Sequence, residues 1–359
     1  MDSEVTLGKR LSSGDFPRHD ARERALVQKR PERALLVAAG GGIGDTLLAG
    51  VVARALRSRF AVVDAVVLPA HADLASHIPA IERVVPLGAR LAERYGGAVV
   101  TWATMRTALL PWRARIPVRV GQARRPYSFL FTHRVVVRSE LGDRTTHWTQ
   151  ILLDYARALG CDTPNATPEF AVREDERQAA RQLLRVHDVD GPFHVLHPTR
   201  GLSAQRSRWP VEGFAALAKR LVARDGVPVL VTGSPHDAPI AEAIADGAGR
   251  GVVAVAGATS IGVFAAVAER ARAVVAMDSG PMHVAAAVGA PTVGIFALQS
   301  DEPDRWAPLG PRVASVRPSY PCPPGHRKET CPDFACVREL DEARIVAALD
   351  GLLLTPAER

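Results

Sequence analysis

Residues 276–283, Ala-Met-Asp-Ser-Gly-Pro-Met-His, bring a carboxylate, a hydroxyl, a glycine and an imidazole together in one short run. An apolar stretch precedes the run and an alanine-rich stretch follows it, so we expect a strand, a turn and a helix. Backbone N–H groups at a helix N-terminus favour an anion, typically a phosphate. The run therefore predicts a phosphate site at Asp278, Ser279 and Gly280, with His283 beside it. The alternative is an ordinary strand-to-helix connection with a hydrogen-bonded histidine.

A glycine-rich turn at residues 40–45, Gly-Gly-Gly-Ile-Gly-Asp, also lies between an apolar run and a helical pattern. It matches a dinucleotide-binding turn only loosely, because Asp45 occupies the third glycine position. Asp64 has a suitable spacing for a ribose ligand, but we expect it before its strand rather than at its end. A nicotinamide or flavin site is therefore not favoured. Asp45 either complements the helix dipole or, in a cleft, is a candidate general base that accepts a hydroxyl proton.

Three further polar runs follow apolar stretches or precede helical ones. In residues 197–200, His-Pro-Thr-Arg, the hydroxyl of Thr199 can bind phosphate oxygens. The arginines there and in residues 206–210, Arg-Ser-Arg-Trp-Pro, can neutralise a diphosphate. In residues 232–237, Thr-Gly-Ser-Pro-His-Asp, Asp237 either accepts hydrogen bonds from a ribose or caps a helix. A solvated basic loop and simple packing of the Trp-Pro pair are the alternatives for the first two runs.

Strand-like and helix-like stretches alternate along the chain, which predicts an α/β fold with mostly parallel sheets covered on both faces. The pattern restarts after an extended stretch, so two doubly wound units are expected in these 359 residues. Ligands gather beyond the carboxyl ends of parallel strands, and a ligand turn in each unit predicts a cleft between them. The expected strands are 34–39, 61–69, 97–102, 193–197, 227–232, 252–256, 274–277 and 292–296. The expected helices include 147–159, 175–187, 211–224, 238–246, 261–270, 283–288 and 341–354.

The chain carries 45 lysines and arginines against 38 acidic residues, a net charge of +7. This balance favours anionic partners such as nucleic acid, phosphorylated small molecules or an acidic membrane surface. No run of about 20 apolar residues occurs, and the first 30 residues lack the apolar core of a secretory signal. Four cysteines do not indicate a disulfide scaffold. We therefore expect a cytoplasmic protein.

Two segments remain outside these turns. Residues 112–134 are basic and aromatic, and they could bind a phosphorylated or lipid-linked molecule or touch an anionic membrane; a solvated basic face is the alternative. Nucleic acid is not expected, because no recognised nucleic-acid module accompanies them. Near the C-terminus, three cysteines and a histidine could bind zinc, but they lack paired C-x-x-C spacing, so no metal is expected. These weak candidates are Cys322, His326, Cys331 and Cys336.

Taken in order, the motifs resemble those of glycosyltransferase family 9, the ADP-heptose:lipopolysaccharide heptosyltransferases. That family has the GT-B fold, in which two Rossmann-like domains face a cleft, and the resemblance runs from about Arg33 to Pro308. The matching runs are Gly42-Ile43-Gly44-Asp45, His197-Pro198-Thr199, Ser207-Arg208-Trp209-Pro210 with Phe214, Gly233 to Asp237, Gly257 to Ile261, and Asp278 to His283 followed by Gly289 and Pro291.

The resemblance implies an inverting enzyme that transfers a heptose or related sugar from an ADP-sugar to a lipopolysaccharide-core or similar acceptor. It implies that Asp45 is the catalytic base, that no cofactor is required beyond the ADP-sugar co-substrate, and that peripheral membrane contact is compatible with a cytoplasmic location. The implied division is a polar extension (1–30), an acceptor-binding domain (31–175), a donor-binding domain (176–340) and a C-terminal helix (341–359). The implied donor-binding residues are Thr199, Arg200, Arg206, Arg208, Gly233, Asp237, Asp278, Ser279, Gly280 and His283. The acceptor-binding candidates are Gly44, Arg113, Arg119 and Arg124.

Two positions depart from the family pattern. Ser207 stands where the family has a phosphate-binding lysine, and the neighbouring arginines are the candidates to supply that charge. Asp237 replaces a ribose-binding glutamate. These departures leave open another nucleotide-sugar donor, or a small-molecule, natural-product or protein acceptor. A nucleotide-sugar-binding protein without catalysis and a dehydrogenase are the remaining alternatives.

Overall fold

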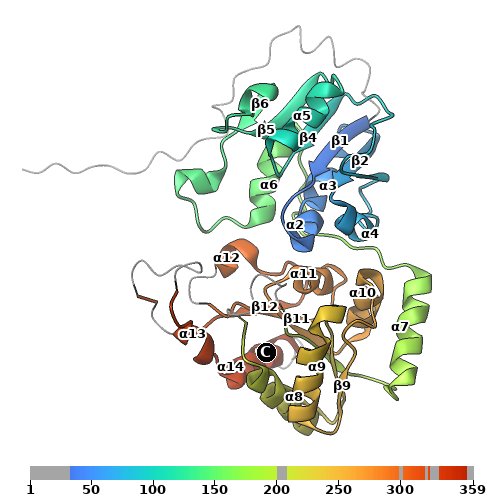
Figure 1. Cartoon of the computed structure of the whole chain (residues 1–359), viewed down its shortest axis with the longest axis vertical. Coiled ribbons are helices and arrows are strands. Elements are labelled where there is room, and N and C mark those ends of the chain that lie inside the picture. The colour runs from blue at the N-terminus through green and yellow to red at the C-terminus, as the bar shows by residue number, and fades with distance from the viewer. Residues whose placement is uncertain (1–32, 200–207, 299–301, 320–321, 324–330, 354–359) are drawn as a thin grey trace, which may run out of the picture.

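The structure is a computed structural model that describes residues 33–199, 208–298, 302–319, 322–323 and 331–353. Figure 1 shows two α/β units, one above the other, the first in blue and green and the second from yellow-green to red. Each contains a six-stranded sheet in which all the strand pairs are parallel. Within the described ranges, no helix is long and apolar enough to cross a membrane.

The first sheet has the strand order β3-β2-β1-β4-β5-β6. Its strands are β1 (Arg33–Ala38), β2 (Val62–Val67), β3 (Arg83–Pro86), β4 (Gly97–Val100), β5 (Val118–Gln122) and β6 (His133–Val135). Strand β1 is apolar on both faces because Leu36 points towards α3 (Gly50–Leu56) and α6 (Trp148–Arg157), while Leu35 points towards α5 (Met105–Arg113). The short helices of this unit are α2 (Ile43–Leu48) and α4 (Ala72–Ala75), with the 3-10 turns η1 (Pro69–His71), η2 (Ser128–Leu130) and η3 (Arg138–Leu141).

The second sheet has the order β12-β11-β10-β7-β8-β9. Its strands are β7 (His194–His197), β8 (Val229–Val231), β9 (Val252–Ala254), β10 (Ala273–Met277), β11 (Thr292–Ile295) and β12 (Val313–Val316). One face packs against α8 (Val211–Asp225), α9 (Ala238–Ala248) and α14 (Glu342–Leu353), and the other against α7 (Glu174–Val186), α10 (Ile261–Arg270) and α11 (Gly280–Ala287). The short helices of this unit are α12 (Pro303–Trp306) and α13 (Ala335–Arg338), with the 3-10 turn η5 (Pro235–Asp237).

A coil over residues 161–173 joins the two units. The helix that follows it, α7, packs against α10, and Arg177 forms a salt bridge with Glu269 at 2.8 Å. The predicted division between residues 175 and 176 falls inside α7, whereas the packing places the whole helix with the second unit. Leu47, Leu74 and Ile78 from the first unit join the apolar cluster of the second, so one side of the junction is a hydrophobic seam.

The predicted α/β fold is confirmed, and every expected strand is present with small shifts at its ends. The expected helix at residues 341–354 is α14, which packs against the second sheet and α8. Sequence patterning missed helix α5 and strands β3, β5, β6 and β12. The N-terminal extension predicted for residues 1–30 lies outside the described residues.

The placement predicted for Asp64 is wrong, because this residue lies inside β2 rather than before it. Its carboxylate is fully buried and accepts hydrogen bonds from Arg83 at 2.9 Å and from the Tyr95 hydroxyl at 2.8 Å, while Arg33 lies 3.3 Å away. These three partners saturate the carboxylate, so Asp64 is a structural ion-pair centre and not a ribose ligand.

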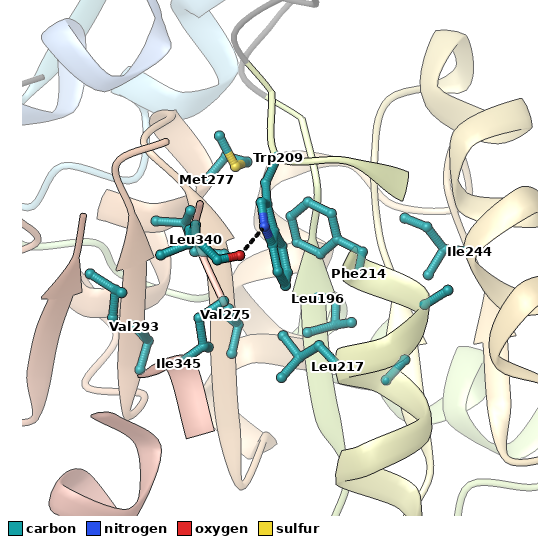
Figure 2. Close-up of a cluster of buried hydrophobic side chains, with 14 of the residues drawn as sticks. Leu196, Trp209, Phe214, Leu217, Ile244, Val275, Met277, Val293, Leu340 and Ile345 are labelled. Atoms are coloured by element: carbon teal, nitrogen blue, oxygen red, sulfur yellow. Dashed lines mark hydrogen bonds between the residues drawn. The ribbon is translucent and has the colours of Figure 1, made fainter. Parts of the chain in front are cut away.

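Trp209 anchors the C-terminal helix to the second unit (Figure 2). Its ring is buried and makes an edge contact with Phe214, with ring centroids 4.8 Å apart. The indole N–H donates to the carbonyl of Leu340 at 2.9 Å, just before α14 begins. A Cβ on Gly213 would lie 2.7 Å from the indole, so a glycine is needed there. Packing is thus the observed role of the Trp-Pro pair.

Candidate active site

The two sheets share a topology that brings certain strand-to-helix turns to a crevice at one edge of each sheet. In each, the chain order reverses between two central strands, β1 and β4 in the first unit and β7 and β10 in the second. Loops that leave such a pair run in opposite directions and open a crevice. The turn after β1 leads into α2 and the turn after β10 leads into α11, and these helices contact one another across the junction, as Figure 1 shows. The two turns that the sequence analysis emphasised therefore meet.

The conformation of the turn that carries Asp45 explains why it is rich in glycine. Asp45 Oδ2 accepts a hydrogen bond from the Gly42 N–H at 2.7 Å, so the carboxylate lies over the start of α2. Gly41 has φ +69°, and a Cβ there would lie 2.3 Å from the same oxygen. A Cβ on Gly40 would lie 1.9 Å from the ring of Trp102. These glycines accommodate the carboxylate and the indole, which accounts for a run that only loosely matches a dinucleotide fingerprint.

Burial raises the pKa of the Asp45 carboxyl above its ordinary value of 3.8. The Gly42 N–H and the nearby His71 oppose this shift without cancelling it. Burial in turn lowers the pKa of His71, whose Nδ1 lies 2.8 Å from the hydroxyl of Thr46. A half-buried carboxylate with a raised pKa has the character of a general base.

The β10–α11 turn lies directly opposite. Gly280 must be a glycine, since a Cβ there would lie 2.0 Å from the Ile43 side chain and 3.1 Å from the Gly44 nitrogen. Conversely, a Cβ on Gly44 would lie 3.3 Å from the Cα of Gly280 and 3.2 Å from the His283 ring. The two helix starts therefore approach backbone to backbone. Ser279 precedes α11, and its hydroxyl donates to the Met277 carbonyl at 2.9 Å.

A polar chain joins the ends of β7 and β8. Thr199 Oγ1 donates to Asp237 Oδ2 at 3.3 Å and lies 3.4 Å from Nε2 of His197. The other ring nitrogen, Nδ1, lies 3.1 Å from the Thr232 hydroxyl. Asp237 Oδ2 also accepts from the N–H and the hydroxyl of Ser234, so it caps the turn η5. Asp237 therefore caps this turn and also lines the cleft between the units.

A cleft of about 870 Å³ lies between the units. The first unit contributes Gly42, Ile43, Gly44, Asp45 and Leu48. The second contributes His197, Thr199, Gly233, Ser234, Asp237, Thr259, Ser260, Ile261, Phe264, Asp278, Ser279, Gly280, Pro281, His283, Glu302 and Trp306. Helices α10 and α11 both begin at this lining, so their N-terminal N–H groups favour an anion there. Among its described residues, the lining has no lysine or arginine.

The structure brings most of the predicted residues together. Asp45, Gly44 and the predicted donor residues Thr199, Gly233, Asp237, Asp278, Ser279, Gly280 and His283 all line the cleft. Arg208 is described but does not line it, and Arg200, Arg206 and Ser207 lie outside the described residues. Binding of a diphosphate by these arginines therefore stays a prediction.

The arginines predicted for the acceptor do not line the cleft. Arg113 and Arg124 are exposed elsewhere on the first unit. The guanidinium of Arg119 donates to the backbone carbonyls of Leu130 and Ile116, at 2.8 and 2.6 Å, which gives it a structural task. Acceptor binding by these three residues stays a prediction, and the cleft itself offers only Gly44 from that set.

Sequence reasoning missed one wall of the cleft. Glu302 and Trp306 come from the segment after β11, and they are held by the first unit. Arg144 pairs with Glu302 at 2.9 Å, and Trp148 stacks on Trp306 with centroids 4.9 Å apart. The sequence marks these two residues as site candidates only by their position, because they follow β11, another strand whose carboxyl end lies at the same edge of the sheet. Thr259, Ser260 and Ile261 were visible as a motif but were not assigned to the site.

Two buried histidines predict how stability depends on pH. Burial lowers the pKa of His197 to about 4 and that of His283 to about 3, from an ordinary 6.5. As pH falls below 6.5, the unfolded chain takes up these protons before the folded protein does. The contribution to stability is therefore complete above pH 6.5 and decreases towards pH 4 for His197 and towards pH 3 for His283. These pKa differences correspond to roughly 3 kcal/mol for His197 and roughly 5 kcal/mol for His283. Urea unfolding in a pH series should show this loss.

Replacing His197 by Asn should remove the part of that pH dependence that belongs to this ring and leave the part that belongs to His283, while the same change at the exposed His236 should leave both parts. An unchanged slope for the His197 variant would contradict the assignment of the loss to this ring.

The weak metal candidates do not form a site in the described residues. Cys322, Cys331 and Cys336 have free thiols, and no group of three potential metal ligands occurs in the ranges described. The Cys331 sulfur accepts a hydrogen bond from the N–H of Phe334 at 3.3 Å. His326 lies outside the described residues.

Comparison with known proteins agrees with this geometry. The family model of glycosyltransferase family 9 (heptosyltransferase) matches residues 85–333. The chain is 26% identical over 310 residues to lipopolysaccharide heptosyltransferase 2 of Salmonella typhimurium, covering 79% of this chain and 87% of that protein. The same protein of Escherichia coli K12 is equally similar.

Solved structures give the fold. A family 9 glycosyltransferase from Veillonella parvula superposes with a TM-score of 0.78 at 18% identity, covering 90% of this chain and 97% of that one. The ADP-heptose heptosyltransferase II of E. coli superposes with a TM-score of 0.71 at 22% identity, covering 89% and 98%. The predicted GT-B fold is thereby confirmed. Because the family model matches well over half of its length, the chain belongs to glycosyltransferase family 9 and is a glycosyltransferase.

Proposed function

We propose that this enzyme transfers a heptose or related sugar from an ADP-sugar to a hydroxyl of a lipopolysaccharide-core or similar glycan, with inversion. The observation that carries the proposal is the position of Asp45, which faces the β10–α11 turn across the cleft. The names of the relatives support the donor and acceptor class.

In the proposed reaction, the donor lies on the second unit, with its diphosphate at the starts of α10 and α11. Asp45 takes the proton from the acceptor hydroxyl as its oxygen attacks the anomeric carbon. The bond from that carbon to the diphosphate oxygen breaks on the opposite face, and the electron pair leaves with the ADP. The helix N–H groups stabilise the negative charge that develops on the leaving group.

Donor identity can be tested without an acceptor. ADP and ADP-sugars should raise the thermal midpoint, because a ligand at 100 times its Kd stabilises the native state by about 2.7 kcal/mol. UDP and GDP at equal concentration should not. A response to a different nucleotide, or to none, would contradict the ADP assignment and favour the second candidate, a different donor, which the departures at Ser207 and Asp237 already raise.

Asp237 is predicted to bind the donor ribose. Replacing it by Ala should weaken ADP binding about tenfold, because a hydrogen bond to a charged group is lost. Calorimetric titration measures the affinity. The matched control is Asp246→Ala, which removes an exposed carboxylate from the same helical region. If Asp237 only caps its turn, the variant will lose stability while its ADP affinity stays the same.

A further inference from the structure

One stretch of the first unit exposes an unusual amount of apolar surface. Large apolar side chains that are this exposed are otherwise limited, among the described residues, to Leu141 and Val186. The four in this stretch, with their exposed fractions, are Trp102 (40%), Met105 (46%), Trp112 (51%) and Phe129 (67%). Grouped exposed apolar side chains of this size mark an interaction surface.

Helix α5 organises this surface. Met105 and Trp112 are seven residues apart, nearly two helical turns, so they project from the same face. Arg106 and Arg113 follow each of them and form a parallel row beside it. The opposite side of the helix, including Pro111, is buried against the sheet. An apolar row therefore faces outwards, flanked by guanidinium groups.

The charge around this helix has a single sign. Residues 94–139 contain nine arginines and no aspartate or glutamate, more positive charge than the whole chain's net +7. Two of these arginines are neutralised by ion pairs, Arg125 with Glu140 and Arg138 with Asp154. Six others are exposed and have no acidic partner among the described residues: Arg94, Arg106, Arg113, Arg115, Arg124 and Arg134.

We propose that this basic-aromatic face, formed by Trp102, Met105, Arg106, Trp112, Arg113 and Phe129, docks on an anionic lipid bilayer. Each arginine near a negatively charged membrane surface strengthens binding roughly fivefold. Tryptophan and phenylalanine side chains settle at the boundary between headgroups and acyl chains, where apolar rings leave water while the arginines stay at the headgroups. The face combines both requirements on one helix and the turn η2 that contacts it.

The face also lies beside the turn that carries Asp45. The Trp102 ring lies against Gly40, at the beginning of the turn that carries Asp45. Docking at this face would thus hold the mouth of the cleft near the bilayer, where a lipid-linked acceptor would be available. That last step rests on the proposed function, whereas the docking itself does not.

Vesicle flotation with the full chain tests the docking independently of catalysis. The protein should bind vesicles of phosphatidylcholine with about 30% phosphatidylglycerol, fail to bind pure phosphatidylcholine, and dissociate at about 0.5 M NaCl. The double variant R106Q/R113Q should bind the anionic vesicles at least about tenfold more weakly. The matched control is R250Q/R312Q, which removes two exposed arginines from the second unit. Thermal unfolding of both variants verifies that they fold.

Insertion of the aromatic row has its own signature. Brominated acyl chains in the anionic vesicles should quench the tryptophan fluorescence, and Trp112→Phe should lose much of that quenching while it still binds. The proposal would be overturned if the protein bound neutral and anionic vesicles equally well. Equal binding of the R106Q/R113Q and R250Q/R312Q variants to anionic vesicles would also overturn it. So would a preference for single-stranded RNA over the vesicles, or self-association that requires Trp112.

Discussion

Replacing Asp45 by Asn should lower the transfer rate by about 10²–10⁴-fold, the usual contribution of a general base. An asparagine oxygen can still accept the hydrogen bond from the Gly42 N–H, so the start of α2 should survive. The thermal midpoint and its increase with ADP should therefore match those of the unmodified enzyme. The rate is measured as ADP release that depends on acceptor.

This design separates the two interpretations of Asp45. If the carboxylate only complements the helix start, the Asn variant will stay active, and that result would rule out the proposed base. The control Asp175→Asn removes an exposed carboxylate far along the chain, on α7, and should leave the rate unchanged.

The pH profile supplies a second criterion. Only the ionised carboxylate accepts a proton, so kcat/KM should fall as pH decreases through the pKa of Asp45. Burial raises that pKa above 3.8, which moves the acid limb of the profile to a higher pH than an exposed aspartate would give. In the Asn variant, the limb that belongs to this group should disappear.

The sequence predicted the turns that line the cleft better than it predicted the sheet edges. Central strands such as β1 and β10 are continuous apolar runs buried on both faces, which makes them visible. Strands β6 and β12 lie at the ends of their sheets and are only partly buried, so no run marks them. Helix α5 contains Pro111 and exposes an apolar row, which together obscure the usual helical pattern.

The strand-to-helix turns at the cleft were predictable because small and polar residues between a strand and a helix constrain the backbone locally. What the sequence could not supply was the surroundings of each turn. The raised pKa of Asp45 depends on burial at α2, a helix that contacts α11 of the second unit. The wall formed by Trp306 depends on stacking with Trp148. Contacts between residues so distant along the chain leave no periodic signal.

Replacing Trp209 by Ala should destabilise the protein by about 3–5 kcal/mol, because it empties a large buried site and removes the contact with Phe214. The variant Trp209→Phe keeps much of the ring but leaves the Leu340 carbonyl without its donor, so it should cost about 1–3 kcal/mol. Urea unfolding followed by circular dichroism measures both. The control is Trp112→Ala, the same change at an exposed site, which should stay within about 0.5 kcal/mol of the unmodified protein. Equal stability of the two alanine variants would show that Trp209 does not hold α14 in place.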